Sequence, residues 1–291
     1  MKTNNKKLNK KPVIKPALAK GVKGATERTV PAYKEIREDS SARTAPESSS
    51  KAESDKSLPL GRGVKIIAEH PCGLIALYKP SGVKSHPNRE GVDVASLVIA
   101  PYNFQLECYE LDSGPKVYLL NRLDSPTSGV ILVATSETVA KKVKALFKNR
   151  LVEKQYIAVV KGKFTQKKET WEDVLEKVAQ KQRLRAEEMG DLTAQTDIEV
   201  LTTSNKVPQL SLIKLTPKTG RTHQLRKQAA MRGHPIAGDK IYGDFKLNRL
   251  LKLKKRFFLH ANSIRLTFNL NGTSIEFSAQ SDVPTEFMAL F

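Results

Sequence analysis

Three short segments of the sequence combine ionisable side chains with residues that favour turns. The first is the loop 121–129, which holds Asp124 between two apolar runs, a setting where functional residues are often found. A carboxylate is ionised at neutral pH, so it can act as a nucleophile or stabilise a growing positive charge without a separate base. The second segment brings Tyr156 into an apolar run, and the third, residues 218–243, carries Arg226. The candidate chemistry is therefore nucleophilic or electrostatic catalysis by a carboxylate.

Taken one at a time, these residues also have purely structural explanations. Asp124 precedes Ser-Pro-Thr and could accept backbone N–H bonds in an Asx turn. Tyr156 alternates with Ala158 and Val160, as an ordinary core tyrosine of a strand would. Arg226 falls within a predicted helix and could lie on its solvated face. No single residue decides between these alternatives.

The order of the motifs is more informative than any one residue. The chain reads Asn-Arg-Leu-Asp-Ser-Pro-Thr-Ser-Gly at 121–129, Lys-Gln-Tyr-Ile-Ala at 154–158, Gly-Arg-Thr-His-Gln-Leu-Arg at 220–226 and Gly-His-Pro-Ile-Ala-Gly-Asp-Lys-Ile-Tyr-Gly at 233–243. Lys-Pro-Ser-Gly precedes them at 79–82, and Leu-His-Ala follows at 259–261. This series resembles the RluA-type pseudouridine synthases in both content and order, and it covers most of residues 64–291.

The resemblance implies isomerisation of a uridine in ribosomal or transfer RNA, in which the base leaves its ribose at N1, rotates and rejoins through C5. It implies no cofactor and no metal. The catalytic residues it implies are Asp124, Arg226 and Tyr156. It also assigns contacts with the substrate RNA to Asn121, Arg122, Thr127, Arg221, His223 and Leu259. The target base must be flipped out of the RNA, at a cost of a few kcal/mol.

Several of these residues have more definite expected roles. By the resemblance, Arg226 pairs with Asp124, which would hold the carboxylate ionised even in a dry pocket. The Tyr156 ring would stack on the extruded uracil, and Arg122 would fill the space vacated by the base or hold a phosphate. The chain departs from the family at Asn121, where a histidine is usual, although an asparagine can still donate and accept hydrogen bonds.

The elements that must position these residues are mostly short strands. Apolar runs bounded by turn residues predict strands at 64–67, 74–78, 117–120, 130–134, 156–160, 210–215, 264–270 and 273–277. Helices are predicted over 135–150, capped by Ser136, and over about 222–232, closed by Gly233. Since turns and hairpins join most strands, we expect an α+β domain on a mainly antiparallel, mixed sheet. The resemblance implies the pseudouridine synthase fold, with flanking helices and a central RNA-binding cleft.

The charge balance favours a polyanionic partner. The 291 residues include 50 Lys and Arg against 30 Asp and Glu, a net charge of +20. Residues 1–57 hold 14 basic and 7 acidic side chains and lack apolar periodicity, so we expect a disordered basic tail ahead of a catalytic domain at 58–291. The remaining +13 belongs to that domain, which points to RNA rather than to a solubilising arm alone.

Other features exclude several classes of protein. No apolar run is long enough to span a bilayer, so we expect no membrane association and a cytoplasmic monomer. Cys72 and Cys108 are too few for a disulfide framework, and the five histidines lack metal-binding spacing. The competing interpretation is a non-catalytic RNA-binding or ribosome-assembly protein that retains the synthase fold.

Overall fold

A sheet of twelve strands organises the described part of the chain. The computed structural model describes residues 58–175, 192–253 and 256–291, so the segment predicted to be a disordered tail, 1–57, lies outside the described residues. Along the chain the strands are β1 (Lys65–His70), β2 (Leu74–Lys79), β3 (Tyr102–Asn103), β4 (Cys108–Tyr109), β5 (Val117–Leu119), β6 (Ser128–Ala134), β7 (Glu153–Lys161), β8 (Lys168–Val174), β9 (Thr193–Thr203), β10 (Leu210–Pro217), β11 (Leu259–Leu270) and β12 (Thr273–Gln280). The helices in these residues are α1 (Glu137–Lys148), α2 (Gln224–Met231), α3 (Phe245–Leu250) and α4 (Thr285–Met288).

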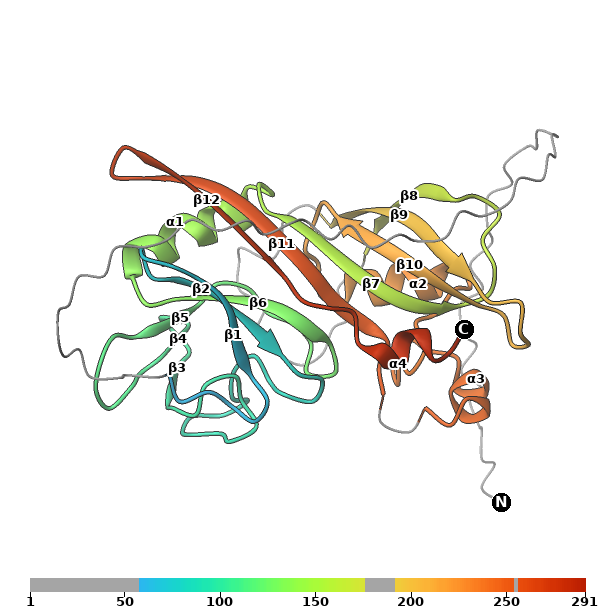
Figure 1. Ribbon diagram of the computed structural model, residues 1–291, viewed down its shortest axis with the longest axis horizontal. Helices are drawn as coiled ribbons and strands as arrows, with labels where there is room; N and C mark the ends of the chain where they lie inside the picture. The colour runs from blue at the N-terminus through green and yellow to red at the C-terminus, as the bar shows by residue number, and fades with distance from the viewer. Residues whose placement is uncertain (1–57, 176–191, 254–255) are drawn as a thin grey trace, which may run out of the picture. The chain divides into compact units, whose positions relative to one another are not determined.

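The strand order places β6, β11 and β7 in the middle of the sheet. The main path runs β3-β4-β5-β6-β11-β7-β10-β9-β8, while β2 pairs with β1 and β6, and β12 pairs with β11 (Figure 1). Every pairing among these strands is antiparallel except that of β6 with β11. The predicted α+β class with a mainly antiparallel, mixed sheet is therefore confirmed, as are all eight predicted strands and both predicted helices.

The parallel contact between β6 and β11 depends on a glycine. Ala261 lies opposite Gly129, whose φ of +117° belongs to the left-handed region. A Cβ at position 129 would collide with the backbone of Ala261, so only glycine allows the two strands to come this close. One residue earlier, Ser128 Oγ lies 2.9 Å from His260 Nδ1, and both side chains are buried. The chain that leaves the loop 121–127 is thus fixed at the centre of the sheet.

Helix α1 forms because its sequence offers a cap and an apolar face. Ser136 is the N-cap, and its side chain accepts a hydrogen bond from the N–H of Val139. Val139 and Val143 are fully buried and pack on Leu132 of β6. The helix therefore covers the part of the sheet built from β2, β6, β11 and β12.

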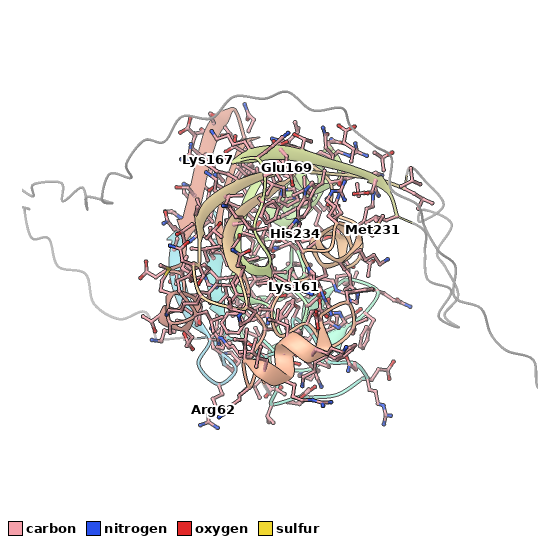
Figure 2. The ribbon with its side chains drawn as sticks, turned by 90° about the vertical axis from the view of Figure 1, so that its right-hand side faces the viewer. Arg62, Lys161, Lys167, Glu169, Met231 and His234 are labelled. Carbon is pink, nitrogen blue, oxygen red and sulfur yellow. The ribbon has the colours of Figure 1, made fainter. Side chains whose placement is uncertain are left out.

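Helix α2 covers the other half, against β7 and β10 (Figure 1). Leu225 and Ala229 are buried there, and the buried Gln228 accepts a hydrogen bond of 2.6 Å from Thr196 Oγ1 of β9. The segment after α2 turns back onto the end of β7, where His234 Nδ1 lies 2.8 Å from the carbonyl oxygen of Lys161 (Figure 2). The middle of α2 and the segment after it are thereby attached to the sheet, which fixes the position of Arg226 in the first turn of the helix.

Candidate active site

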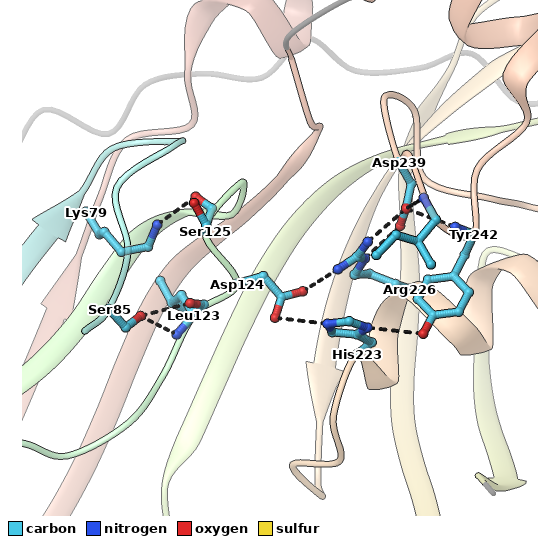
Figure 3. Close-up of polar contacts among 10 residues, drawn as sticks. Lys79, Ser85, Leu123, Asp124, Ser125, His223, Arg226, Asp239 and Tyr242 are labelled. Carbon is cyan, nitrogen blue, oxygen red and sulfur yellow. Dashed lines mark hydrogen bonds and ion pairs between the residues drawn. The ribbon is translucent and has the colours of Figure 1, made fainter. Parts of the chain in front are cut away.

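The loop before β6 and the first turn of α2 meet at one ion pair. Arg226 Nη1 donates a hydrogen bond of 2.7 Å to Asp124 Oδ2, across 102 residues of chain (Figure 3). The Arg226 side chain is 5% exposed, whereas that of Asp124 is 30% exposed. The carboxylate therefore has one side against a buried cation and the other side accessible.

A second carboxylate fixes the guanidinium. Arg226 donates to Asp239 through Nε at 2.7 Å and through Nη2 at 2.9 Å, a bidentate pair. The rings of Tyr242 and Phe257 each lie 5.2 Å from the Arg226 guanidinium carbon. Burial disfavours the charged form of Asp239, but hydrogen bonds from Arg226 and from the N–H groups of Tyr242 and Ile241, together with the Arg226 charge, hold the pKa of Asp239 below its usual value. Arg226 is consequently rigid and has one nitrogen left for Asp124.

His223 lies beside the same carboxylate. Its Nε2 is 3.7 Å from Asp124 Oδ1, and its Nδ1 is 3.1 Å from the hydroxyl of Tyr242. His223 has a φ of 54°, an unusual left-handed backbone conformation at the residue that precedes α2. Burial lowers the pKa of His223, although the negative charge of Asp124 opposes the shift. At neutral pH the imidazole is therefore neutral and adds no competing cation.

Lys79 supports the Asp124 loop from behind. Its side chain is fully buried, and Nζ donates to the carbonyl oxygens of Pro80 at 3.1 Å and Val83 at 2.7 Å. Nζ also donates to the carbonyl oxygen of Ser125 at 3.1 Å (Figure 3). Burial lowers the pKa of Lys79 to about 7, and the charge of Asp124 opposes this shift. Lys79 belongs to the Lys-Pro-Ser-Gly motif at 79–82, from which no role for it was predicted. Its function depends on a contact across 46 residues, which the sequence pattern does not specify.

Hydrogen bonds from the residues after Lys79 complete the support. Ser85 Oγ donates to the carbonyl oxygen of Leu123 at 2.8 Å and accepts from its N–H at 3.1 Å. Ser81 Oγ donates to the carbonyl oxygen of Pro126 at 2.7 Å. The residues on both sides of Asp124 are therefore attached to the segment 79–85, which we call the supporting strap.

A cavity of about 470 Å³ opens next to the accessible side of Asp124. We call it the tyrosine cavity because Tyr156 of β7 lies in its wall. Burial, with a contribution from the Asp124 charge, raises the pKa of Tyr156 to about 12, so the phenol stays protonated. All residues assigned to the site from the sequence line this cavity: Asn121, Arg122, Asp124, Thr127, Tyr156, Arg221, His223, Arg226 and Leu259.

These residues differ in how they face the cavity. Arg122 is exposed, so its guanidinium is available at the opening. Thr127 and Leu259 are buried in the wall, and Arg221 Nε donates to the carbonyl oxygen of Thr193 at 3.3 Å. Asn121 Oδ1 accepts a hydrogen bond of 2.8 Å from the N–H of Leu132 in β6. The residue that departs from the family pattern therefore performs a structural task.

Two of the structural explanations weighed for single residues are wrong. Asp124 accepts the N–H of Thr127 through its main-chain oxygen, while its side chain faces Arg226, so it does not form the side-chain bond of an Asx turn. Arg226 is buried, because two carboxylates and two rings replace water around it, and it does not lie on a solvated helix face. Tyr156 is half-buried and packs on two core clusters while also lining the cavity.

The arrangement can hold a planar, neutral ring against a phenol while presenting a carboxylate to its edge. Arg226 keeps that carboxylate oriented, and Arg122 lies at the opening. Within residues 58–175, 192–253 and 256–291, no group of three or more His, Cys, Asp or Glu side chains is placed to hold a metal ion. Over the same residues, no helix combines the length and apolar character needed to cross a membrane.

Comparison with known proteins identifies the family. Residues 73–231 match the RNA pseudouridylate synthase family. The chain is 33% identical over 231 residues to tRNA pseudouridine synthase C of Pasteurella multocida, covering 75% of this chain and 92% of that protein. The protein of the same name from Haemophilus ducreyi is 33% identical over 220 residues, covering 72% and 88%. Human RNA pseudouridylate synthase domain containing 1 shares the fold, with a TM-score of 0.56 and 23% identity over 76% of this chain and 84% of that one. The chain therefore belongs to the RNA pseudouridylate synthase family.

Proposed function

We propose that this protein converts a uridine of transfer RNA to pseudouridine, with Asp124 as the reacting carboxylate. The observation that carries the proposal is the contact of 2.7 Å between Asp124 and the buried Arg226 in the wall of the tyrosine cavity. Two relatives that are each 33% identical bear the name tRNA pseudouridine synthase C, which favours transfer RNA over ribosomal RNA as the substrate.

The reaction is an isomerisation, so every atom of the uridine is retained. The bond between N1 and C1′ breaks, a bond between C5 and C1′ forms, and the proton on C5 is replaced by one on N1. Asp124 is the group placed to attack or to stabilise the electron-poor centre, since its second oxygen is not bonded to Arg226. Water must be kept from that centre, and a flipped base stacked on Tyr156 would exclude it.

Arg226 supplies orientation in this proposal. Its bidentate pair with Asp239 prevents rotation of the guanidinium, so the nitrogen facing Asp124 has one position. Arg122 is exposed at the opening and can occupy the space that the flipped base leaves in the RNA. The flip costs a few kcal/mol, and such contacts offset it.

The decisive experiment replaces Asp124 by asparagine, which keeps the shape and removes the charge. The substrate is total transfer RNA from a strain without this gene, and pseudouridine is mapped by mass spectrometry before and after incubation. Wild-type protein is expected to add pseudouridine at a defined position, and Asp124→Asn to add none. The matched control is Asp112→Asn, which neutralises an exposed acid outside both the loop and the cavity. Product formation by Asp124→Asn, with an unchanged circular dichroism spectrum, would remove the carboxylate from the mechanism.

The same assay, run in parallel on ribosomal RNA from that strain, separates the alternatives. Product in ribosomal RNA alone would change the substrate class but not the reaction. Binding to RNA with no product in either pool would favour the non-catalytic, ribosome-assembly interpretation. We also propose that residues 58–291 form the catalytic unit, because every residue assigned to the site comes from this part of the chain. We further propose that the protein acts as a cytoplasmic monomer.

A further inference from the structure

A second cavity, of about 550 Å³, lies on the other side of the pair formed by Asp124 and Arg226. We call it the lysine cavity because Lys240 lies in its wall. The two cavities share a common wall, made of Arg122, Leu123, Asp124, His223 and Arg226. A molecule bound in one cavity can therefore extend past the Asp124 carboxylate into the other cavity.

The lysine cavity is positively charged. Lys84, Arg122, Lys240 and Arg256 line it in addition to Arg226, while Asp124 is the only acidic side chain among its lining residues. Lys84 is neutralised by Asp93 at 2.7 Å, so the unbalanced charge comes from the other cations. A wall of this composition attracts anions.

Three of these cations retain hydrogen-bonding capacity. In the part of the chain that the structure describes, neither Arg122 nor Lys240 forms an ion pair with an acidic side chain, and both are exposed. Arg256 Nε is buried without a hydrogen-bond partner, and its Nη2 lies 3.5 Å from Glu286, a loose contact. A buried donor without a partner costs free energy, so this arrangement favours an incoming acceptor.

The cations are held in place by the scaffold of the active site. Asp239, which anchors Arg226, also accepts the N–H of Ile241 at 2.8 Å and of Tyr242 at 3.0 Å. The turn that presents Lys240 is thus fixed to the same carboxylate. Gly238 lies against the carbonyl group of Arg256, where any side chain would collide, so the segments that carry Lys240 and Arg256 run side by side. The main chain that carries both donors is therefore fixed, so binding needs little reordering of the backbone.

We propose that the lysine cavity binds backbone phosphates of the RNA nucleotides next to the flipped uridine, through Lys240 and Arg256. The inference rests on the proposed function, because it requires the uridine to occupy the tyrosine cavity. With its base there and its ribose at Asp124, the RNA strand must continue past the common wall into a cationic space. Contacts to phosphate fix the position of the RNA without reading its sequence.

The test is the salt dependence of pseudouridine formation on full-length transfer RNA. Each phosphate contact contributes about 0.7 to 0.9 to the slope of log affinity against log salt. Lys240→Ala should make the slope of log kcat/KM shallower by about that amount between roughly 50 and 300 mM NaCl, and raise KM roughly fivefold. The value of kcat should change by less than about twofold, because the reacting groups are untouched. Lys246→Ala, which removes an exposed lysine outside both cavities, should leave the slope and KM unchanged.

A second variant guards against indirect effects. Arg256 also packs over the Phe287 ring, so Arg256→Met is examined together with its thermal unfolding. Combined with Lys240→Ala, it should change the slope by about twice the single effect. An unchanged slope for Lys240→Ala would overturn the inference, while loss of pseudouridine formation by the wild type would instead overturn the proposed function. Inorganic phosphate should inhibit the wild type beyond the effect of NaCl at equal ionic strength, since it competes for the same donors, and should inhibit Lys240→Ala less; equal inhibition of both proteins would overturn the inference.

Discussion

The Arg226 guanidinium binds two carboxylates, Asp239 and Asp124, and it binds them unequally. Asp239 is 1% exposed and receives two hydrogen bonds from Arg226, whereas Asp124 is 30% exposed and receives one from it. The strongly bound, buried carboxylate positions the cation, and the weakly bound, accessible one is free to react. Without Asp239, the buried Arg226 would have only the accessible Asp124 as its counter-charge, and that carboxylate would no longer be free to react.

The first prediction concerns the free energy of unfolding. Arg226→Met keeps the side-chain length but leaves Asp239 buried without a cation, so it should lower stability by about 3–5 kcal/mol. Chemical denaturation monitored by circular dichroism measures the loss. Adding Asp239→Asn in the same chain should restore part of it, because the uncompensated charge is then absent. Additive losses in the double variant would contradict the assigned coupling.

Asn121 gives a second prediction at this scale, since its structural hydrogen bond can be tested apart from catalysis. Its Oδ1 accepts the N–H of Leu132, and a histidine could accept the same bond through Nδ1. Asn121→His should therefore keep pseudouridine formation within about threefold. Asn121→Leu leaves the N–H of Leu132 without a partner and should cost about 1–3 kcal/mol of stability. Loss of activity in the histidine variant at full stability would assign Asn121 a direct role in substrate binding.

At the scale of elements, the supporting strap 79–85 connects the end of β2 to the loop that carries Asp124, so the position of the strand determines the position of the carboxylate. Lys79 ends β2 and binds the carbonyl oxygen of Ser125, so a shift of the strand moves the loop. Lys79→Met should lower kcat roughly 10- to 100-fold, since small displacements of reacting groups are costly, while KM for transfer RNA stays nearly constant. Steady-state kinetics on transfer RNA, which gives kcat and KM separately, checks this prediction. A rise in KM alone would show that Lys79 contributes to RNA binding instead.

His260, where β11 pairs with β6, should make the protein less stable in acid. Burial lowers the pKa of His260 to about 4 from the usual 6.5, helped by the charge of Arg256 and opposed by hydrogen bonding to Ser281. Between pH 6.5 and 4 the unfolded chain binds a proton that the native chain does not, so acid favours unfolding. As the pH falls from 7 to 4, the free energy of unfolding of the wild type should decrease by about 3 kcal/mol more than that of His260→Asn. Denaturant titrations at several pH values test this, and parallel curves for both proteins would contradict it.

The elements also show what could be predicted from the sequence. Strands with contiguous apolar residues, such as β6 and β10, were predicted because burial and β-propensity coincide in them. Strand β8 has Trp171 as its buried apolar residue, and β9 buries Thr196, a polar residue satisfied by Gln228 of α2. Strand β8 therefore has no local apolar period. Strand β9 does alternate, with Ala194 and Ile198 buried beside Thr196, but the polar Thr196 interrupts the apolar series and no strand was predicted there. Strands β3 and β4 have two residues each and offer no period at all.

The same distinction applies to the site. Asp124, Tyr156 and Arg226 could be found because each belongs to a motif, and the pairing of Asp124 with Arg226 was implied by the resemblance of those motifs to the family. Asp239 was present in the quoted motif at 233–243, but its role required knowledge that it shares Arg226 with Asp124. The common wall between two cavities has no sequence signal, because it is made by segments brought together only in the folded chain.

For the whole molecule, the charge is divided between two regions with different consequences. Residues 58–291 carry 36 basic and 23 acidic side chains, and residues 1–57 carry 14 and 7. In the described region many lysines are neutralised by nearby acids, as Lys141 is by Glu137 and Lys161 by Asp244. Within the described region other cations without an ion pair lie elsewhere, such as the exposed Lys142 and Lys246, but Arg122 and Lys240 lie together at the lysine cavity and concentrate positive charge beside Asp124.

This division predicts how a variant lacking residues 1–57 should behave. The described cores, both cavities and all site residues lie after residue 57, so the midpoint of chemical unfolding and kcat on transfer RNA should stay within error of the full chain. The lost excess of seven positive charges should act through long-range attraction alone. We therefore expect slower association at low salt, seen as a higher KM below about 50 mM NaCl, and convergence of the two proteins at about 300 mM, where charges are screened within a few ångströms. A fall in kcat that persists at high salt would instead mean that residues 1–57 contact the substrate or the site directly, and the proposed catalytic unit would have to be extended to include them.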